Sequence, residues 1–350
     1  TAEWIEQVSS ELHYNDKNLI EKVIRALSLL EMLVKAGCPL VFKGGTALML
    51  ILGKSAHRLS IDIDLICPPG TNIEDYLKSF ADFGFINLEL VERKQRDDAD
   101  IPKSHSKFFY QIAYRNDTDA QSYILLDVLY EDIHYFRTQQ IAINCPFIRL
   151  EGKPLMVTVP SAEDILGDKL TAFAPNTTGI PYYRNGRSCS MEIAKQLYDV
   201  GRLFENVSDL QITKEAFRTI AVVELSYRSF GTDIGQVFND IRQTALCIST
   251  RGKAGEGDFD LIQDGIIRVK SFMYKQRYLI DHAIIDAARA AYLATLIEKG
   301  INEIESYSNN PADIKDMVIR PSLPNKLNKL RSNLPEAYYY WAKTSELLEA

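Results

Sequence analysis

Two short stretches in the first part of the chain carry residue types that could act on phosphates. One is the glycine turn Gly44-Gly45-Thr46, and the other holds Asp62 and Asp64, two residues apart. A glycine turn ahead of a helix exposes backbone N–H groups that can hold phosphate oxygens. Two neighbouring carboxylates can hold a divalent cation such as Mg²⁺. The two stretches together indicate nucleotide chemistry.

The spacing of the aspartates is weak evidence by itself, because the same D-x-D pattern occurs four times. Only Asp62 and Asp64 alternate with aliphatic residues, as on a strand, so that both carboxylates lie on one face. Two carboxylates at a buried strand end repel each other unless a cation lies between them. The plain alternative is that this face is merely exposed to solvent; the nearby glycine turn favours the cation site. The other pairs sit in polar, turn-like surroundings or after a glycine-rich loop: Asp98/Asp100, Asp117/Asp119 and Asp258/Asp260.

The glycine turn also has a plain structural interpretation, as a strand-to-helix turn that needs positive φ. Residues 39–42 fit a short buried strand before it, and residues 46–52 fit a buried helix that ends at Gly53. The turn matches neither the G-x-x-x-x-G-K-[ST] phosphate loop nor the G-x-G-x-x-G dinucleotide motif. Its proposed role with phosphate therefore depends on the aspartate pair that follows.

The remaining pattern predicts an α+β protein with a mixed sheet in its first half and helices in its second. A helix start is indicated at Pro160-Ser161, where Glu163 and Asp164 place negative charge in the first turn. We expect a first domain at residues 1–175 and a helical domain at 190–350. Further strands are expected at 59–66, 85–91, 107–114, 123–130 and 156–159. Further helices are expected at 72–83, 192–204, 214–227, 233–248, 261–275 and 279–299.

Bulk composition bounds the class of protein. The 350 residues are 46% hydrophobic and 25% charged, as in ordinary globular proteins. The net charge of −7 gives no overall attraction to nucleic acid. The sequence lacks any run of about 18 or more apolar residues, and its first thirty residues read as an amphipathic helix, so neither a membrane span nor a signal peptide is expected. Five scattered cysteines without a C-x-x-C pair favour a reducing cytoplasm.

The motif F-K-G-G-T-A-L, followed by R-x-S-x-D-x-D-L, resembles the nucleotidyltransferases of the polymerase-beta-like superfamily. More narrowly, it resembles the AbiEii/AbiGii toxin family of abortive-infection (phage-defence) and toxin–antitoxin systems. The resemblance covers roughly residues 38–205. It implies a polymerase-beta-like nucleotidyltransferase domain with a mixed sheet, followed by a mostly helical domain. It also implies transfer of a nucleoside monophosphate from a triphosphate to an acceptor hydroxyl, with release of pyrophosphate.

The family resemblance extends to two later positions. Asp127, in the predicted strand Leu125-Leu126-Asp127-Val128, fits the family's third carboxylate; an acid on an edge strand is the plain alternative. Lys169, in the sequence Lys-Leu-Thr-Ala, fits its triphosphate-binding lysine, although a lone helix lysine is usually a solvated surface group.

The resemblance assigns a role to each motif. Phosphates would lie on Gly44, Gly45 and Thr46, with Lys169 offsetting their charge. Asp62, Asp64 and Asp127 would bind Mg²⁺ in a two-metal site, with Mn²⁺ as an alternative ion. Arg58 would contact phosphate or brace the aspartate strand.

The resemblance also implies partners, and it weakens toward residue 205. It implies a cognate antitoxin and an acceptor such as tRNA or another RNA, while the residues leave the nucleotide and the acceptor open. The family's R-x-K-D-x-x-D-L helix is matched only loosely: Asp199 fits, but no acid follows Lys195. The roles of Asp199, Arg184 and Arg187 are therefore left open.

Three other interpretations compete with the nucleotidyltransferase. A D-x-D glycosyltransferase would use a sugar nucleotide and release a nucleoside diphosphate, but it leaves the glycine turn unexplained. A haloacid-dehalogenase-like phosphatase wants Thr or Val where Ile66 stands. A non-catalytic, nucleotide-binding scaffold would not need the three acids and Lys169 together; failure to bind Mg²⁺ and any nucleotide would favour it.

Overall fold

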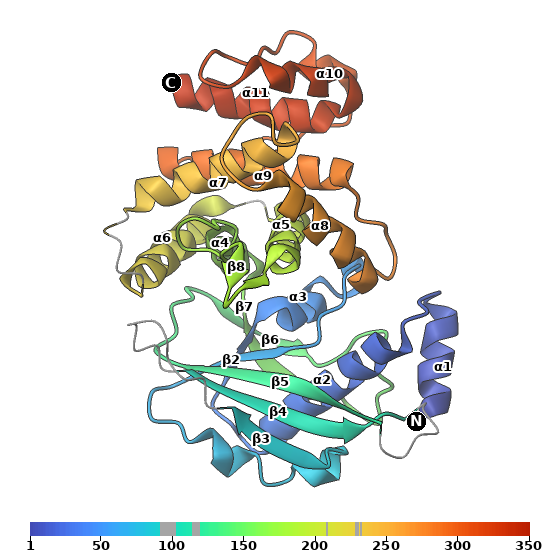
Figure 1. The fold of residues 1–350 in the computed structure, drawn as a ribbon. Helices are drawn as coiled ribbons and strands as arrows, with labels where there is room; N and C mark the ends of the chain where they lie inside the picture. The colour runs from blue at the N-terminus through green and yellow to red at the C-terminus, as the bar shows by residue number, and fades with distance from the viewer. Residues whose placement is uncertain (92–102, 114–119, 208, 228–230, 232) are drawn as a thin grey trace. The chain divides into compact units, whose positions relative to one another are not determined.

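A computed structural model describes the chain except for residues 92–102, 114–119, 208, 228–230 and 232 (Figure 1). It forms two compact units, residues 1–161 with 271–277, and residues 162–270 with 278–350. This division differs from the expected ranges of 1–175 and 190–350 at two places. The helix that carries Lys169 belongs to the second unit, and a short segment of the later chain, residues 271–277, belongs to the first. The pairs Asp98/Asp100 and Asp117/Asp119 lie outside the described residues.

The first unit is built on a five-stranded sheet with the order β1-β2-β5-β4-β3 (Figure 1). Strands β2 and β5 run parallel, and the other neighbours run antiparallel. The predicted α+β class with a mixed sheet is therefore confirmed. The strands are β1 (Val41–Lys43), β2 (Ile63–Cys67), β3 (Asn87–Val91), β4 (Lys103–Gln111) and β5 (Gln121–Tyr130).

Alternation along the strands gives this sheet two different faces. In β5, Ile124, Leu126 and Val128 are buried, whereas the residues between them are only half-buried. Helix α2 (Lys17–Lys35) contacts β2 and β5, and its apolar residues share one core with the buried strand residues. Asp127 therefore lies on the face opposite to that core. Helix α1 (Ala2–Glu11) packs on α2, and the hairpin of β6 (Thr138–Ala142) and β7 (Met156–Pro160) contacts β1 through β7.

The predicted short helix after the glycine turn is confirmed as α3 (Gly44–Leu52), which ends at Gly53. The helix expected at 72–83 is wrong. This stretch forms two 3₁₀ turns, Ile73–Tyr76 and Phe80–Phe83, neither of which has a side-chain cap at its start. Because no side chain caps the first N–H groups, this stretch forms short 3₁₀ turns instead of a continuous α-helix. The helix expected at 261–275 is shorter, because α8 (Phe259–Val269) gives way to a 3₁₀ turn, Lys270–Phe272.

The second unit is helical, as expected, with one small hairpin (Figure 1). Helix α9 (Ile280–Lys299) is its most buried element and contacts α5, α7 and α11. Its run of alanines lets these neighbours approach closely. The other elements are α4 (Ala162–Ala172), α5 (Ser190–Phe204), α6 (Leu210–Ser226), α7 (Ile234–Ser249), α10 (Leu330–Asn333), α11 (Pro335–Glu349) and the strands β8 (Tyr183–Arg184) and β9 (Arg187–Ser188).

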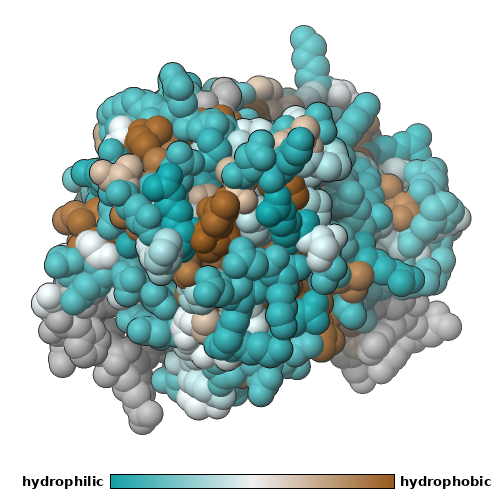
Figure 2. Space-filling model, turned by 90° about the horizontal axis from the view of Figure 1, so that it is seen from above, coloured by the Kyte–Doolittle hydropathy of each residue, from teal (hydrophilic) through white to brown (hydrophobic). Residues whose placement is uncertain are grey.

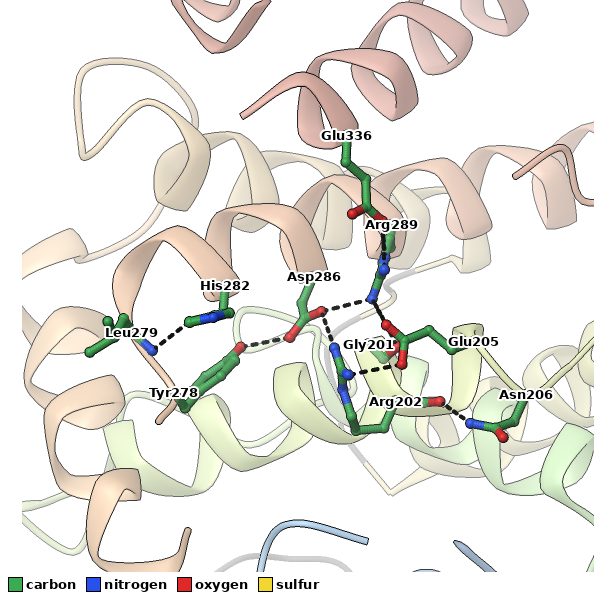
Figure 3. Close-up of polar contacts among 10 residues, drawn as sticks. All are labelled: Gly201, Arg202, Glu205, Asn206, Tyr278, Leu279, His282, Asp286, Arg289 and Glu336. Atoms are coloured by element: carbon green, nitrogen blue, oxygen red, sulfur yellow. Dashed lines mark hydrogen bonds and ion pairs between the residues drawn. The ribbon is translucent and has the colours of Figure 1, made fainter. Parts of the chain in front are cut away.

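A buried charged network holds three of these helices together (Figure 3). Asp286 on α9 accepts hydrogen bonds from Tyr278 at 3.0 Å, Arg289 at 3.3 Å and Arg202 at 3.5 Å. Arg289 also binds Glu336 of α11. Burial raises the pKa of the Asp286 carboxyl, although the two guanidinium groups act in the opposite direction. The network links α5, α9 and α11. Removal of any one of its charged side chains would leave another charge buried without a partner.

The molecular surface seen in Figure 2 is mostly hydrophilic, with separate apolar residues instead of one continuous apolar patch. Among the described helices, none combines the length and the apolar character that crossing a membrane would require.

Candidate active site

The sheet register brings the predicted acids into one row. Asp64 of β2 is the Cα partner of Asp127 of β5, and these two strands are parallel. On either side, Lys43 of β1 pairs with Asp64, and His105 of β4 pairs with Asp127. Paired residues of neighbouring strands project from the same face, so Lys43, Asp64, Asp127 and His105 form one row across four strands. Asp62 lies just before the first residue of β2, Ile63, and outside the paired part of the sheet.

The glycine turn packs directly on the second aspartate. Gly44 has a φ of +78°, which residues with side chains rarely adopt. A Cβ at this position would also lie 2.1 Å from Oδ2 of Asp64, far inside van der Waals contact. Both the backbone conformation and the close approach therefore require glycine here.

The next two turn residues contact the rest of the aspartate motif. A Cβ on Gly45 would lie 2.7 Å from Oγ of Ser60 and 3.0 Å from Nη2 of Arg58. The Oγ1 of Thr46 donates a hydrogen bond of 2.7 Å to the carbonyl of Asp62. Thr46 and Asp62 are 16 residues apart in the sequence, and this hydrogen bond joins the glycine turn to the aspartate motif.

Helix α3 begins at Gly44, at the end of β1, and its preceding residue Lys43 provides no side-chain cap. The first N–H groups of a helix have no partner inside the helix and carry the positive end of its dipole. Here they lie next to Asp64, whose carboxylate packs on Gly44. A phosphate group at this helix start would meet backbone donors on one side and the acids on the other.

The three acids have the chemistry of a magnesium site, because carboxylate oxygens are preferred ligands of that ion. Within the described residues, however, no three side chains of His, Cys, Asp or Glu already form a metal-holding cluster. The Asp127 carboxylate is bound to His105, with 2.5 Å between Nδ1 and Oδ1. Asp64 and Asp127 thus share a face on adjacent strands, and among the described residues the three acids do not converge on one point.

Arg58 is buried, with its guanidinium beside Gly45 and a hydrogen bond of 3.0 Å from Nη1 to the carbonyl of Leu59. Its backbone is held by residues 271–277. The N–H of Leu59 donates to the carbonyl of Phe272 at 2.8 Å, and the N–H of Tyr274 donates to the carbonyl of His57 at 3.0 Å. This geometry suits a brace for the start of the aspartate motif; the contact of Arg58 with phosphate stays a prediction.

Tyr274 fixes this returning segment. Its hydroxyl donates to the carbonyl of Ala56, and its ring packs edge-on against Phe147 with 5.1 Å between the ring centres. Burial raises the pKa of Tyr274 to about 12, so the hydroxyl stays a donor at neutral pH.

Lys169 lies on α4 in the second unit, and its ammonium group is buried with a counterion. Nζ lies 3.0 Å from Oδ2 of Asp199 on α5 and donates a hydrogen bond of 2.9 Å to Oε1 of Gln196. Asp199, whose role the sequence left open, is therefore the partner of Lys169. The assignment of Lys169 to the triphosphate stays a prediction.

The model of the AbiEii nucleotidyl transferase toxins, of type IV toxin–antitoxin systems, matches residues 27–313 of the sequence. The chain belongs to this AbiEii family. The resemblance inferred from the glycine and aspartate motifs is thereby confirmed, and the match extends beyond residue 205 into the helical unit. Among proteins of curated function, none matches.

Two solved structures are similar to this AbiEii family member over most of their length. JHP933 from Helicobacter pylori is 17% identical, with 82% of this chain and 92% of that one covered and a TM-score of 0.39. The nucleotidyltransferase toxin MenT4 from Mycobacterium tuberculosis is 15% identical, with 84% and 89% covered and a TM-score of 0.41. Similarity this low carries no argument about the site.

In this AbiEii protein the two arginines that the sequence left unassigned form a hairpin. Arg184 and Arg187 are exposed and lie directly opposite each other on β8 and β9. Between them, Asn185 and Gly186 both have positive φ, as a two-residue hairpin turn requires. This hairpin lies in the stretch between the two expected domains, residues 176–189, where Asn176 also donates two hydrogen bonds of 2.9 and 2.7 Å to Asp240 of α7.

His105 is the site residue that sequence reasoning missed. It lies on β4, outside the glycine and aspartate motifs, so no local motif points to it. Its partner on the next strand is Asp127, which only the β4–β5 register reveals.

Proposed function

We propose that this AbiEii-family toxin transfers a nucleoside monophosphate from a nucleoside triphosphate to an acceptor hydroxyl and releases pyrophosphate. The observation that carries the proposal is the pairing of Asp64 with Asp127 on parallel strands while Gly44 packs on Asp64. It puts the glycine turn and two carboxylates at one place on the sheet. Family membership supports the coarser statement that the chain is a toxin nucleotidyltransferase.

In this proposal the triphosphate lies at the start of α3. The backbone N–H groups of Gly44, Gly45 and Thr46 bind its β- and γ-phosphates, and the helix dipole favours their charge. Lys169 and Arg58 offset the remaining negative charge. The bond from Thr46 to the Asp62 carbonyl supports the turn in the required conformation.

The transfer itself needs a proton acceptor and an in-line arrangement. Asp127 accepts the proton of the acceptor hydroxyl, whose oxygen then bonds to the α-phosphorus. The bond from that phosphorus to the oxygen bridging to the β-phosphate breaks, and pyrophosphate leaves with the electron pair. Asp62, Asp64 and Asp127 would hold two Mg²⁺ ions, or Mn²⁺, which supply charge neutralisation on the attacking and leaving oxygens.

The acceptor we propose is a hydroxyl of tRNA or another RNA, and the partner that restrains the toxin is a cognate antitoxin. A role in phage defence follows from the same proposal. These statements are supported by family membership and by the proposed reaction class.

The test is to incubate the protein with each α-labelled nucleoside triphosphate, Mg²⁺ or Mn²⁺, and in turn tRNA, total RNA and a cell lysate. Label should appear in RNA with the wild type and be absent with Asp64→Ala. A matched control is Asp260→Ala, because Asp260 belongs to another D-x-D pair, exposed in the first turn of α8. That variant should transfer label like the wild type.

Two results would contradict the proposal. One is transfer retained by a folded Asp64→Ala variant. The other is consumption of a sugar nucleotide with release of a nucleoside diphosphate, which would support the D-x-D glycosyltransferase instead.

A further inference from the structure

His105 and Asp127 are hydrogen-bonded across the β4–β5 ladder. They are Cα partners in the antiparallel register, so both side chains leave the sheet from the same face. The distance from His105 Nδ1 to Asp127 Oδ1 is 2.5 Å. Only 10% of the histidine side chain is exposed, against 36% of the aspartate side chain. The ring is thus largely enclosed, while the carboxylate that it binds still faces outward.

The direction of this hydrogen bond follows from the chemistry of its partners. An ionised carboxylate only accepts hydrogen bonds, so the proton lies on Nδ1 of the imidazole. The bond uses one lone-pair site of Oδ1 and leaves Oδ2 facing an incoming group. A carboxylate with one oxygen tethered has lost rotation about its terminal bond, which pre-orients the second oxygen.

A neighbouring basic residue on this face of β4, which also carries Lys103, has other partners. Lys107, two residues along the strand, lies 3.6 Å from Glu89 and sits over the ring of Tyr123 at 5.5 Å. Within the described part of the chain, His105 is the side chain that holds the Asp127 carboxylate. If Asp127 were only a solvent-exposed residue on a strand face, it would not need an enclosed histidine as its hydrogen-bond partner.

We propose that His105 is a positioning residue for nucleotidyl transfer. By donating its Nδ1–H to Oδ1, it holds the Asp127 carboxylate in the orientation in which Oδ2 accepts the proton of the acceptor hydroxyl. This inference rests on the proposed function. It assigns a specific task to a histidine that neither the motifs nor the family match singles out.

The test compares three substitutions that differ in where they place an N–H donor. In His105→Asn the amide nitrogen takes nearly the place of Nδ1, whereas in His105→Gln it falls nearer to Nε2. His105→Leu keeps bulk and removes the donor. Lys107→Met serves as a control for a change on the same strand face. Thermal unfolding of each variant establishes that it is folded.

The readouts are kcat and KM for the triphosphate in the α-label assay with RNA acceptor. For His105→Leu and His105→Gln we expect kcat to fall about 10–100-fold, as is typical when the group orienting a functional side chain is lost. KM for the triphosphate should not change, because the hydrogen bond acts on the acceptor step. His105→Asn should recover most of kcat, and Lys107→Met should match the wild type.

A second readout does not depend on activity. In protein labelled with [¹⁵N]histidine, the His105 Nδ1 proton should give a hydrogen-bonded signal that Asp127→Ala removes.

The inference is overturned if His105→Leu transfers label like the wild type, if Asn and Gln lose equal activity, or if Asp127→Ala leaves the Nδ1 signal unchanged. Failure of the proposed function would look different. In that case Asp64→Ala would be as active as the wild type, or no protein would transfer label at all.

Discussion

Gly44 and Asp64 approach so closely that any side chain on Gly44 would occupy the place of the aspartate carboxylate. The Cβ of an alanine would lie 2.1 Å from Oδ2 and 3.0 Å from Cβ of Asp64. The position of the glycine turn is therefore fixed relative to the strand that carries Asp64. Whatever binds at the start of α3 is placed against the row of acids by this contact.

Gly44→Ala should reduce nucleotidyl transfer about 100-fold, because displacing a reacting group by even an ångström can cost that much. The matched control is Gly300→Ala, where the backbone is left-handed with a φ of +75° but nothing lies within 4 Å of the added Cβ. Both variants should lose about 1–2 kcal/mol of unfolding free energy from the positive φ of the backbone. Gly44→Ala should lose more than the control, because its Cβ also overlaps the Asp64 carboxylate. Urea unfolding and label transfer measure the two effects. Equal transfer by the two variants would contradict the importance of the contact.

Asp199→Ala should lower the unfolding free energy of the protein by about 3–5 kcal/mol, because it leaves the buried ammonium of Lys169 without its counterion. The double variant Lys169→Met with Asp199→Leu should recover much of that loss in urea unfolding. It should still fail to transfer label, since Lys169 is proposed to bind the triphosphate. A stable double variant with wild-type transfer would remove Lys169 from the site.

Asp240 predicts a specific dependence of stability on pH. Its burial raises the pKa of the carboxyl above the ordinary 3.8, against hydrogen bonds from Asn176, Thr177 and Thr244. The folded state therefore keeps this proton to a higher pH than the unfolded state does. The stabilisation that Asp240 contributes to the folded protein is full below pH 3.8 and is lost as the pH rises through the pKa of the folded state. Relative to Asp240→Asn, which does not titrate, the wild type should lose unfolding free energy over that window. Urea unfolding across pH measures it; a constant or growing advantage of the wild type would contradict the prediction.

Tyr274→Ala should both destabilise the first unit and impair transfer, because it releases the segment that holds residues 57–59. A loss of about 3–5 kcal/mol is typical when a large buried aromatic becomes alanine. Tyr274→Phe keeps the ring and loses only the hydrogen bond to Ala56, for which about 0.5–1.5 kcal/mol is expected. Its transfer should stay near that of the wild type. Full activity of a folded Tyr274→Ala variant would show that the brace is dispensable.

The parts of the site that could be predicted from the sequence are those set by local spacing. Alternation of aliphatic and acidic residues predicted the strand β2, which carries Asp64, and Gly53 marked the end of α3. Asp62 lies just before that strand, so the face that it shares with Asp64 stays a prediction. The strand that carries Asp127 was also visible, because aromatic and branched residues dominate it.

The parts that could not be predicted depend on which distant segments meet. The bond from His105 to Asp127 requires the register between β4 and β5, which no local pattern encodes. The pairing of Phe272 with Leu59 joins residues more than 200 positions apart, in a stretch whose apolar spacing indicated a continuing helix. The role of Asp199 became visible only through its contact with Lys169 on another helix.

The measurement that tests the central claim most directly compares α-labelled with γ-labelled nucleoside triphosphate in the wild type and in Asp64→Asn. This substitution keeps the size of the side chain that packs on Gly44 and removes its charge. We predict that the acceptor takes label only from the α-position, that pyrophosphate is released in equal amount, and that folded Asp64→Asn transfers none. Label transferred from the γ-position, or transfer that persists in Asp64→Asn, would contradict a nucleotidyltransferase site centred on Asp64 and Asp127.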